Sequence, residues 1–177
     1  MTRSAAASDL AAIVKAYDIR GVVDEQLTAE MVRALGGAFA RFVGPDAGAV
    51  VVAHDMRESS PQLAAALADG VTAAGLDVLD AGLGSTDLLY YASGSLGLPG
   101  AMFTASHNPA RYNGIKFCLA GAVPLSLGTG LDRIRDDAMA VLDGAGPQPA
   151  AAPGTVTSRS LLEDYASYLR RLVDLSG

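Results

Sequence analysis

The sequence predicts an α/β fold: a three-layer sandwich with a mostly parallel, four-stranded mixed sheet whose last strand is antiparallel. Two features favour this fold. Short apolar runs alternate with helical patterns in the order strand, helix, strand, helix, strand. The fourth strand follows the third after about ten residues without a helix, whereas a parallel crossover needs a dozen or more, so this strand should return antiparallel.

The first half of the chain supplies two helices and one strand. Residues 28–42 place apolar side chains at helical spacing. Residues 49–53, AVVVA, are apolar throughout, which is typical of a strand buried on both faces. The next helix should begin with Ser60 as its cap and Pro61 in its first turn.

The second half completes the sheet. A helix with Thr86 as its N-cap should separate the second and third strands. The predicted strands are residues 76–81, 100–104 and 115–120, and the predicted helices are residues 88–93 and 130–142.

The chain is predicted to contain one domain and the start of another. Residues 1–145 form the first domain, and residues 146–160 are rich in Pro, Gly and Ala, which is typical of a linker. Residues 161–177 carry a helix, opened by a capping box of Ser160 and Glu163, that should begin a second domain. No internal repeat is evident.

Composition excludes several classes of protein. The formal charge of −6 disfavours nonspecific nucleic-acid binding. Apolar runs are too short for a membrane span, and the N-terminus lacks the apolar core of a signal peptide, so a cytoplasmic protein is expected. The single cysteine, Cys118, excludes an internal disulfide and a multi-cysteine zinc site. Nothing in the sequence predicts an oligomeric state.

Positive charge without acid is concentrated in one segment. The chain has 19 acidic residues, yet none lies between Asp87 and Asp132. This segment contains FTASHNPARYNGIKF at 103–117. In the chain as a whole, a polar loop follows each of three predicted strands: HDMRESSP, GLGSTD and ASHNPARYNG. Because ligands bind outside the carboxyl ends of parallel strands, these loops are expected to meet at one edge of the sheet.

Ser106 is the candidate reactive group. Its hydroxyl lies in a loop with His107 and Arg111, and Lys116 follows shortly after. A hydroxyl in a positive loop suits a phosphoryl group, which it can carry or contact. Two alternatives remain open: a serine hydrolase, although G-x-S-x-G is absent, and simple turn chemistry.

Two further segments could serve the same edge. In KAYDIRG, Tyr17 and Arg20 could approach a phosphate, or Asp18 could form a surface ion pair with Arg20 or Lys15. In HDMRESSP, the polar side chains could simply brace the loop and cap the helix.

KAYDIRG, HDMRESSP, GLGST, TASHNP and YNGIK, in this order, resemble the first domain of the α-D-phosphohexomutases, and most closely the phosphomannomutase/phosphoglucomutase branch. The resemblance covers residues 12–143. TASHNP after a strand, followed by NGIK, is its most specific part.

The resemblance implies a function and roles for residues. Ser106 would be phosphorylated and would exchange its phosphoryl group with a hexose phosphate, through a bisphosphorylated sugar, and would also bind Mg²⁺. His107 and Lys116 would act in catalysis. Tyr17, Arg20 and Asn108 would bind substrate.

The resemblance also implies partners for this chain. The family's Asp-rich metal loop, of the type DGDxDR, is absent from the 177 residues. The remaining Mg²⁺ ligands and sugar-binding motifs are therefore expected in further mutase domains, without which this chain should be inactive. Asp87 departs from the Pro that often follows Ser-Thr in the family. The alternative is a stand-alone phosphate-binding or scaffold module.

Overall fold

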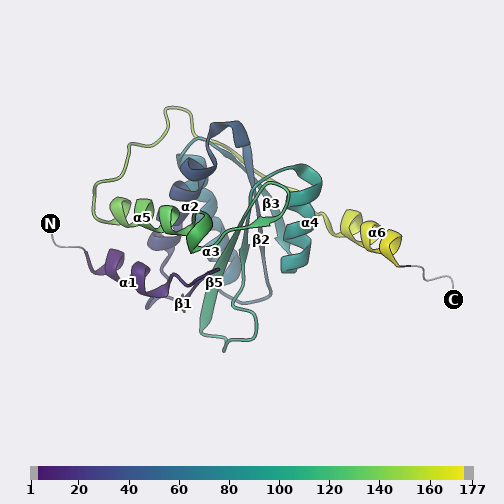
Figure 1. The fold of residues 1–177 in the computed structure, drawn as a ribbon, viewed down its shortest axis with the longest axis horizontal. Helices are drawn as coiled ribbons and strands as arrows, with labels where there is room; N and C mark the ends of the chain where they lie inside the picture. Colours follow the sequence, from purple (N-terminus) through teal and green to yellow (C-terminus); the bar gives the residue numbers. More distant parts are fainter. Residues whose placement is uncertain (1–3, 174–177) are drawn as a thin grey trace.

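The computed structural model describes residues 4–173, and the outer ends of the predicted domain ranges, 1–3 and 174–177, lie outside them. It confirms the predicted α/β fold with three layers. The sheet lies in the centre, with α1, α2, α3 and α5 on one side and α4 on the other, while α6 extends away from the body (Figure 1). None of the helices in 4–173 has both the length and the apolar character that a membrane crossing requires.

The predicted elements are present, together with several that were not predicted. The helices are α1 (Ala5–Ile13), α2 (Ala29–Val43), α3 (Ser60–Ala73), α4 (Thr86–Leu96), α5 (Leu131–Leu142) and α6 (Leu162–Leu172). The strands are β1 (Ile19–Val22), β2 (Ala49–His54), β3 (Asp77–Leu83), β4 (Gly100–Phe103), β5 (Tyr112–Leu119), β6 (Val123–Pro124) and β7 (Val156–Ser158). Helix α1 was missed because its Ala-rich sequence has only a weak apolar stripe.

The sheet has the predicted mixed topology but is wider than expected. Its order is β1-β5-β4-β2-β3-β7, with β6 paired to β5. Strands β4, β2, β3 and β7 are parallel, and β5 is antiparallel to β4, as predicted, and also to β1. The sheet has seven strands within the described residues instead of four. The added strands β1, β6 and β7 are two to four residues long, too short to show a period of two.

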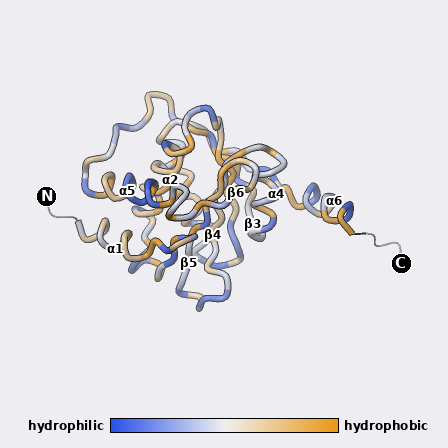
Figure 2. The backbone as a smooth tube through the Cα atoms, in the orientation of Figure 1, coloured by the Kyte–Doolittle hydropathy of each residue, from blue (hydrophilic) through white to orange (hydrophobic). Residues whose placement is uncertain are grey.

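Two apolar clusters hold the layers together. The larger contains side chains of α1, α2, α3 and α5 with one face of the sheet, and the smaller lies under α4. Figure 2 shows the hydrophobic strands inside this sandwich and more hydrophilic segments in the outer loops. Helices α2 and α3 approach each other at Gly36 and Gly70, where an added Cβ on either would overlap the backbone of the other helix.

Two helix starts differ from the prediction by one residue. Helix α4 is capped by Ser85, whose hydroxyl accepts the N–H of Leu88 at 3.2 Å, and not by Thr86. Ser60 is the first residue of α3 and not its cap, because its hydroxyl donates to the Asp55 carboxylate at 2.7 Å.

Residues 146–160, predicted as a linker, are docked on the sheet in their second half. Strand β7 pairs with β3. Before it, the Gly154 N–H donates to the carbonyl of Thr72 at 2.9 Å, and the Thr155 N–H and hydroxyl donate to Asp77 at 2.7 and 2.9 Å.

Helix α6 follows from Leu161 without a side-chain cap, so the predicted capping box is not formed. None of the residues of α6 is buried, and Leu162 and Leu172 are exposed on it. The division into two domains stays a prediction.

The contact between Asp77 and Thr155 makes stability depend on pH. The two Thr155 donors lower the pKa of Asp77 from its usual 3.8, so the ionised form stabilises the fold above that pH, and this contribution is lost as pH falls through the folded-state value. We therefore expect Asp77→Asn to unfold at lower urea concentration than the parent at pH 7. The gap should narrow below pH 3.8. A gap that is independent of pH would contradict this assignment.

Candidate active site

The loops after β2, β3 and β4 meet at the carboxyl ends of these parallel strands, as expected. The Asp55 N–H donates to the carbonyl of Phe103 at 2.9 Å, and the Gly84 N–H donates to that of His54 at 2.9 Å. Residues 104–111, which join β4 to β5 and are here called the Ser106 loop, therefore start beside the loop that contains Asp55.

Ser106 is exposed and has an unusual backbone conformation. Its φ is 52°, in the left-handed region that residues with a Cβ rarely adopt. The Thr104 hydroxyl accepts the Ser106 N–H at 3.0 Å, and the Asn108 N–H closes a turn onto the carbonyl of Ala105 at 3.0 Å. The local hydrogen bonds thus hold the Ser106 hydroxyl outside the sheet, where a ligand can reach it.

One arginine of the β2 loop binds the Ser106 loop. The terminal nitrogen Nη2 of Arg57 donates to the carbonyls of Ser106 and Asn108, each at 2.8 Å. Its other terminal nitrogen, Nη1, donates to the carbonyls of Pro109 at 3.1 Å and Tyr112 at 3.0 Å. The sequence allowed Arg57 to brace its own loop, but nothing in the sequence pairs it with a segment about fifty residues away.

A partly buried polar network holds Arg57 in turn. The Asp55 carboxylate accepts the Arg57 N–H at 3.0 Å and lies 3.3 Å from its Nε. The same carboxylate accepts the Ser60 hydroxyl, and the side-chain amide of Asn113, which is fully buried, donates to the hydroxyls of Ser59 and Ser60 at 2.9 Å. The start of α3, the β2 loop and the start of β5 are thereby linked around the Ser106 loop.

Arg20 and Lys116 lie on neighbouring strands and share one carboxylate. The Asp18 Oδ2 lies 2.6 Å from Nη2 of Arg20 and 3.4 Å from Nζ of Lys116. The Asp18–Arg20 pair is one of the alternatives that the sequence left open. The expectation that no acid opposes the cations was wrong, because β1 pairs with β5 and brings Asp18 next to Lys116.

Gly114 permits this close pairing of β1 and β5. It lies opposite Arg20 in the ladder, where an added Cβ would overlap the carbonyl of Ile19. Lys116 lies two residues further along β5 and therefore on the same face of the sheet as Gly114.

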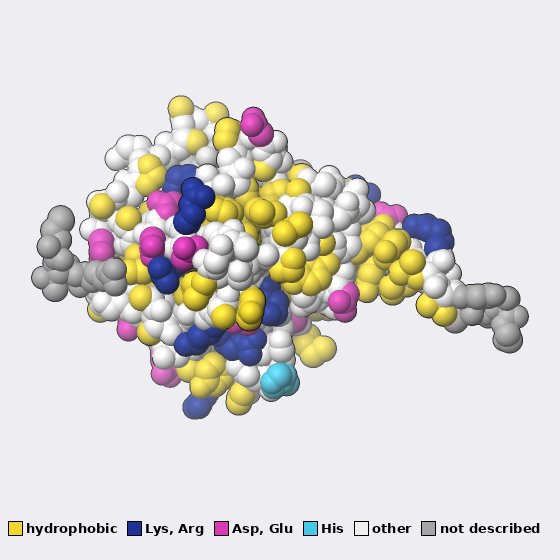
Figure 3. Space-filling view, in the orientation of Figure 1, with side chains coloured by type: hydrophobic (Ala, Val, Ile, Leu, Met, Phe, Trp, Pro, Cys, Tyr) yellow, Lys and Arg dark blue, Asp and Glu magenta, His cyan; other side chains and the backbone are white. Residues whose placement is uncertain are grey.

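The other predicted site residues are more solvent-accessible. The side chains of Tyr17 and His107 are exposed, and Asn108 is half-buried. In residues 4–173 no hydrogen bond joins the Ser106 hydroxyl to Arg20 or Lys116. Figure 3 shows Lys and Arg side chains gathered on the lower part of the face drawn, near a His side chain.

The single cysteine is not a rival nucleophile. Cys118 is buried, and burial raises the pKa of its thiol, so the reactive thiolate is disfavoured. Ser106 is therefore the better candidate.

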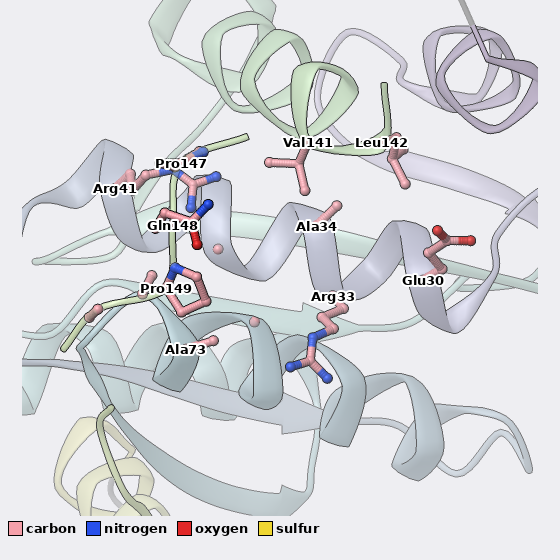
Figure 4. A pocket seen from close by; sticks show the side chains of 14 residues that line it. Glu30, Arg33, Ala34, Arg41, Ala73, Val141, Leu142, Pro147, Gln148 and Pro149 are labelled. Carbon is pink, nitrogen blue, oxygen red and sulfur yellow. The ribbon is translucent and has the colours of Figure 1, made fainter. Parts of the chain in front are cut away.

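One cavity of the structure lies away from the predicted site residues. A cavity of about 310 Å³ lies between α2, α3 and α5, beneath Pro147 to Ala150, with Arg33 and Arg41 on its walls (Figure 4). None of the predicted site residues lines it.

The left-handed conformation of Ser106 predicts an order of stability. Strain of about 1–2 kcal/mol for a residue with a Cβ exceeds the extra chain entropy of glycine, about 0.4–1 kcal/mol. Ser106→Gly should therefore be more stable than Ser106→Ala by up to about 1.6 kcal/mol. Urea unfolding of both variants measures the difference, and an alanine variant of equal or higher stability would contradict the conformation.

Comparison with known proteins identifies the domain. Residues 11–138 match the family described as phosphoglucomutase/phosphomannomutase, alpha/beta/alpha domain I. A phosphomannomutase of Escherichia coli is 41% identical over 164 residues, which are 92% of this chain and 35% of the relative. A phosphomannomutase of Klebsiella pneumoniae is 41% identical over 152 residues, which are 85% of this chain and 94% of the relative.

A solved structure agrees. The phosphoglucomutase/phosphomannomutase family protein of Burkholderia thailandensis superposes with a TM-score of 0.79 at 35% identity, over 93% of this chain and 36% of that one. The chain thus spans about a third of the length of the E. coli and Burkholderia relatives. It belongs to the phosphoglucomutase/phosphomannomutase family, whose α/β/α domain I it contains.

Proposed function

We propose that this chain is the phosphoserine-bearing domain of a phosphohexomutase, which interconverts the 1-phosphate and 6-phosphate of mannose or glucose. The observation that carries the proposal is an exposed Ser106 hydroxyl in a built loop at the carboxyl edge of the sheet. Arg20 and Lys116, together with Asp18, leave a net charge of +1 on the neighbouring strands, which suits a phosphate-bearing substrate.

The proposed reaction has two transfers. In the first, the free 1- or 6-hydroxyl of a hexose monophosphate gives its proton to a base as its oxygen bonds to phosphorus, and the bond between phosphorus and Oγ of Ser106 breaks as Oγ takes up a proton. In the second, the Ser106 hydroxyl gives its proton to a base as Oγ bonds to the other phosphorus of the reoriented bisphosphate, and the released sugar oxygen takes up a proton.

The roles of the surrounding side chains follow from their chemistry. His107 is exposed beside Ser106, and its imidazole can accept or donate a proton, which suits proton transfer. Lys116 lies 3.4 Å from the Asp18 carboxylate, and its ammonium can balance developing negative charge. Tyr17, Arg20 and Asn108 are the proposed contacts to the sugar phosphate.

The described residues do not fit a complete Mg²⁺ site. No group of three or more His, Cys, Asp or Glu in residues 4–173 could hold a metal ion. The carboxylates on the adjoining segments are already paired with other groups. Asp18 pairs with Arg20 and Lys116, and Asp55 pairs with Arg57 and Ser60. We therefore propose Ser106 as one Mg²⁺ ligand, with the others on further mutase domains, and assign no step to the ion.

Further parts of the proposal concern the whole protein. The chain spans about a third of most relatives, so we propose that it acts with additional mutase domains in the cytoplasm and turns over no substrate alone. One observation favours a second candidate, a stand-alone phosphate-binding or scaffold module: the Klebsiella relative is matched over 94% of its length. A serine hydrolase is disfavoured because His107 is exposed and pairs with no carboxylate in the part of the chain described.

A chimera tests the proposal. Residues 1–177 replace the matched segment of the E. coli phosphomannomutase, and conversion of mannose 1-phosphate is measured with a trace of mannose 1,6-bisphosphate. Ser106→Ala should lower kcat by about 10³-fold or more, because the nucleophile is removed.

The matched control is Ser8→Ala, whose hydroxyl bonds only to its own helix and which should leave turnover unchanged. Peptide mapping of the parent chimera should locate a phosphoryl group on Ser106. Normal turnover in the Ser106→Ala chimera would overturn the proposal.

A further inference from the structure

We propose that Arg57 is a positioning residue for phosphoryl transfer, which fixes the Ser106 loop in the conformation that the reaction uses. The proposal rests on the proposed function of Ser106 and assigns a role to a side chain that touches neither Ser106 Oγ nor the sugar. Arg57 acts through the main chain of residues 106–112, with all four terminal N–H groups donated to carbonyls.

The geometry requires a guanidinium. Each terminal nitrogen carries two hydrogens, and each faces two carbonyls at 2.8–3.1 Å. The Asp55 carboxylate forms an ion pair with Nε at 3.3 Å, although Nε itself donates no hydrogen bond among the described residues. A lysine ammonium has three donors around one point, so it cannot satisfy four carbonyls spread around a plane.

The four hydrogen bonds from Arg57, here called the clamp, also orient the main-chain N–H of His107, next to Ser106. A trans peptide carries its C=O and N–H on opposite sides, and no cis peptide occurs in residues 4–173. Because the Ser106 carbonyl points at Arg57, the N–H of His107 points away from it. No hydrogen bond to this N–H is found among the described residues. It is therefore free to donate to an oxygen of a phosphoryl group on Ser106.

The clamp further explains how Ser106 keeps a strained φ of 52°. Left-handed backbone persists in residues with a Cβ only where surrounding contacts determine it. On the carboxyl side of Ser106, Arg57 donates to the carbonyls of Ser106 and Asn108. On its amino side, the Ser106 N–H donates to the hydroxyl of Thr104, so the backbone is fixed on both sides of the strained residue.

The test combines a structural and a kinetic measurement. Amide hydrogen exchange of the 177-residue chain is compared for the parent, Arg57→Lys, and the control Arg33→Lys, which alters an exposed pair with Asp69 at 3.6 Å. Arg57→Lys should raise the exchange rates of the hydrogen-bonded amides of Ser106, Asn108 and Tyr112 at least 10-fold, while the strands β2 and β3 keep parental rates. The control should change neither.

The same variants are then placed in the E. coli chimera. Arg57→Lys should lower kcat by about 10²-fold, as expected for a displaced reacting group, with KM for mannose 1-phosphate changed less than about threefold. Asp55→Asn keeps the size of the side chain that pairs with Arg57 and should lower kcat by less than Arg57→Lys does. This variant tests the proposal even if Arg57→Lys does not fold.

Each outcome decides the proposal. Parental exchange of the loop in Arg57→Lys, or a loosened loop with normal kcat, would overturn it. A loss that appears only in KM would make Arg57 a binding residue and would also overturn it. If Ser106→Ala kept full turnover, the proposed function would fail instead, and the exchange result would still decide whether Arg57 fixes the loop.

Discussion

Four main-chain carbonyls between Ser106 and Tyr112 accept hydrogen bonds from the guanidinium of Arg57, and the candidate site depends on these bonds. A loop that leaves the sheet has no ladder partners, so its carbonyls must find donors elsewhere. Here one side chain donates to four of the seven carbonyls from 106 to 112, and the carboxylate of Asp55 balances its charge. The loop is thus organised from behind, which leaves its outer surface, with the Ser106 hydroxyl, available to solvent.

The cations around the loop differ in their partners and in their exposure. The side chain of Arg57 is only 11% exposed, and it interacts with four carbonyls and the carboxylate of Asp55. Arg20 and Lys116 are about a quarter exposed and share the single carboxylate of Asp18. One carboxylate between two cations keeps both side chains in place while leaving an excess of positive charge. An arrangement with two acids would be neutral, and one without any would leave two flexible cations to repel each other.

Much of the fold could be predicted, because it follows from patterns of local sequence. The buried strand AVVVA, helix α2 and the antiparallel return of β5 were all expected, since a strand buried on both faces and an amphipathic helix have clear signatures. Strands β1 and β7 were missed because strands of three or four residues exist only through their neighbours. The caps of α3 and α4 were misplaced by one residue because adjacent serines and threonines are equally able to cap a helix.

The sequence allowed Ser106, Arg20 and Lys116 to be chosen as site residues, which stays a prediction, but it did not indicate Arg57 or the contacts between these segments. Ser106 and its loop could be chosen from the sequence, because a polar loop after an apolar strand is a local feature. The link from Arg57 to that loop joins segments about fifty residues apart, and the link from Asp18 to Lys116 joins segments nearly a hundred apart. No pattern in one sequence encodes which carbonyls a given arginine reaches.

Strand order explains why these distant residues meet. Because β5 returns antiparallel beside β4, Lys116 lies opposite Met102, four residues before Ser106, and not at the far end of a crossover helix. Because β1 then adds to the outer side of β5, Arg20 lies opposite Gly114 and Asp18 reaches Lys116. A fourth strand parallel to the others would have carried Lys116 away from this edge. The departure from parallel order at β5 is therefore the feature of the fold that places Lys116 on the strand next to β4, from which the Ser106 loop follows.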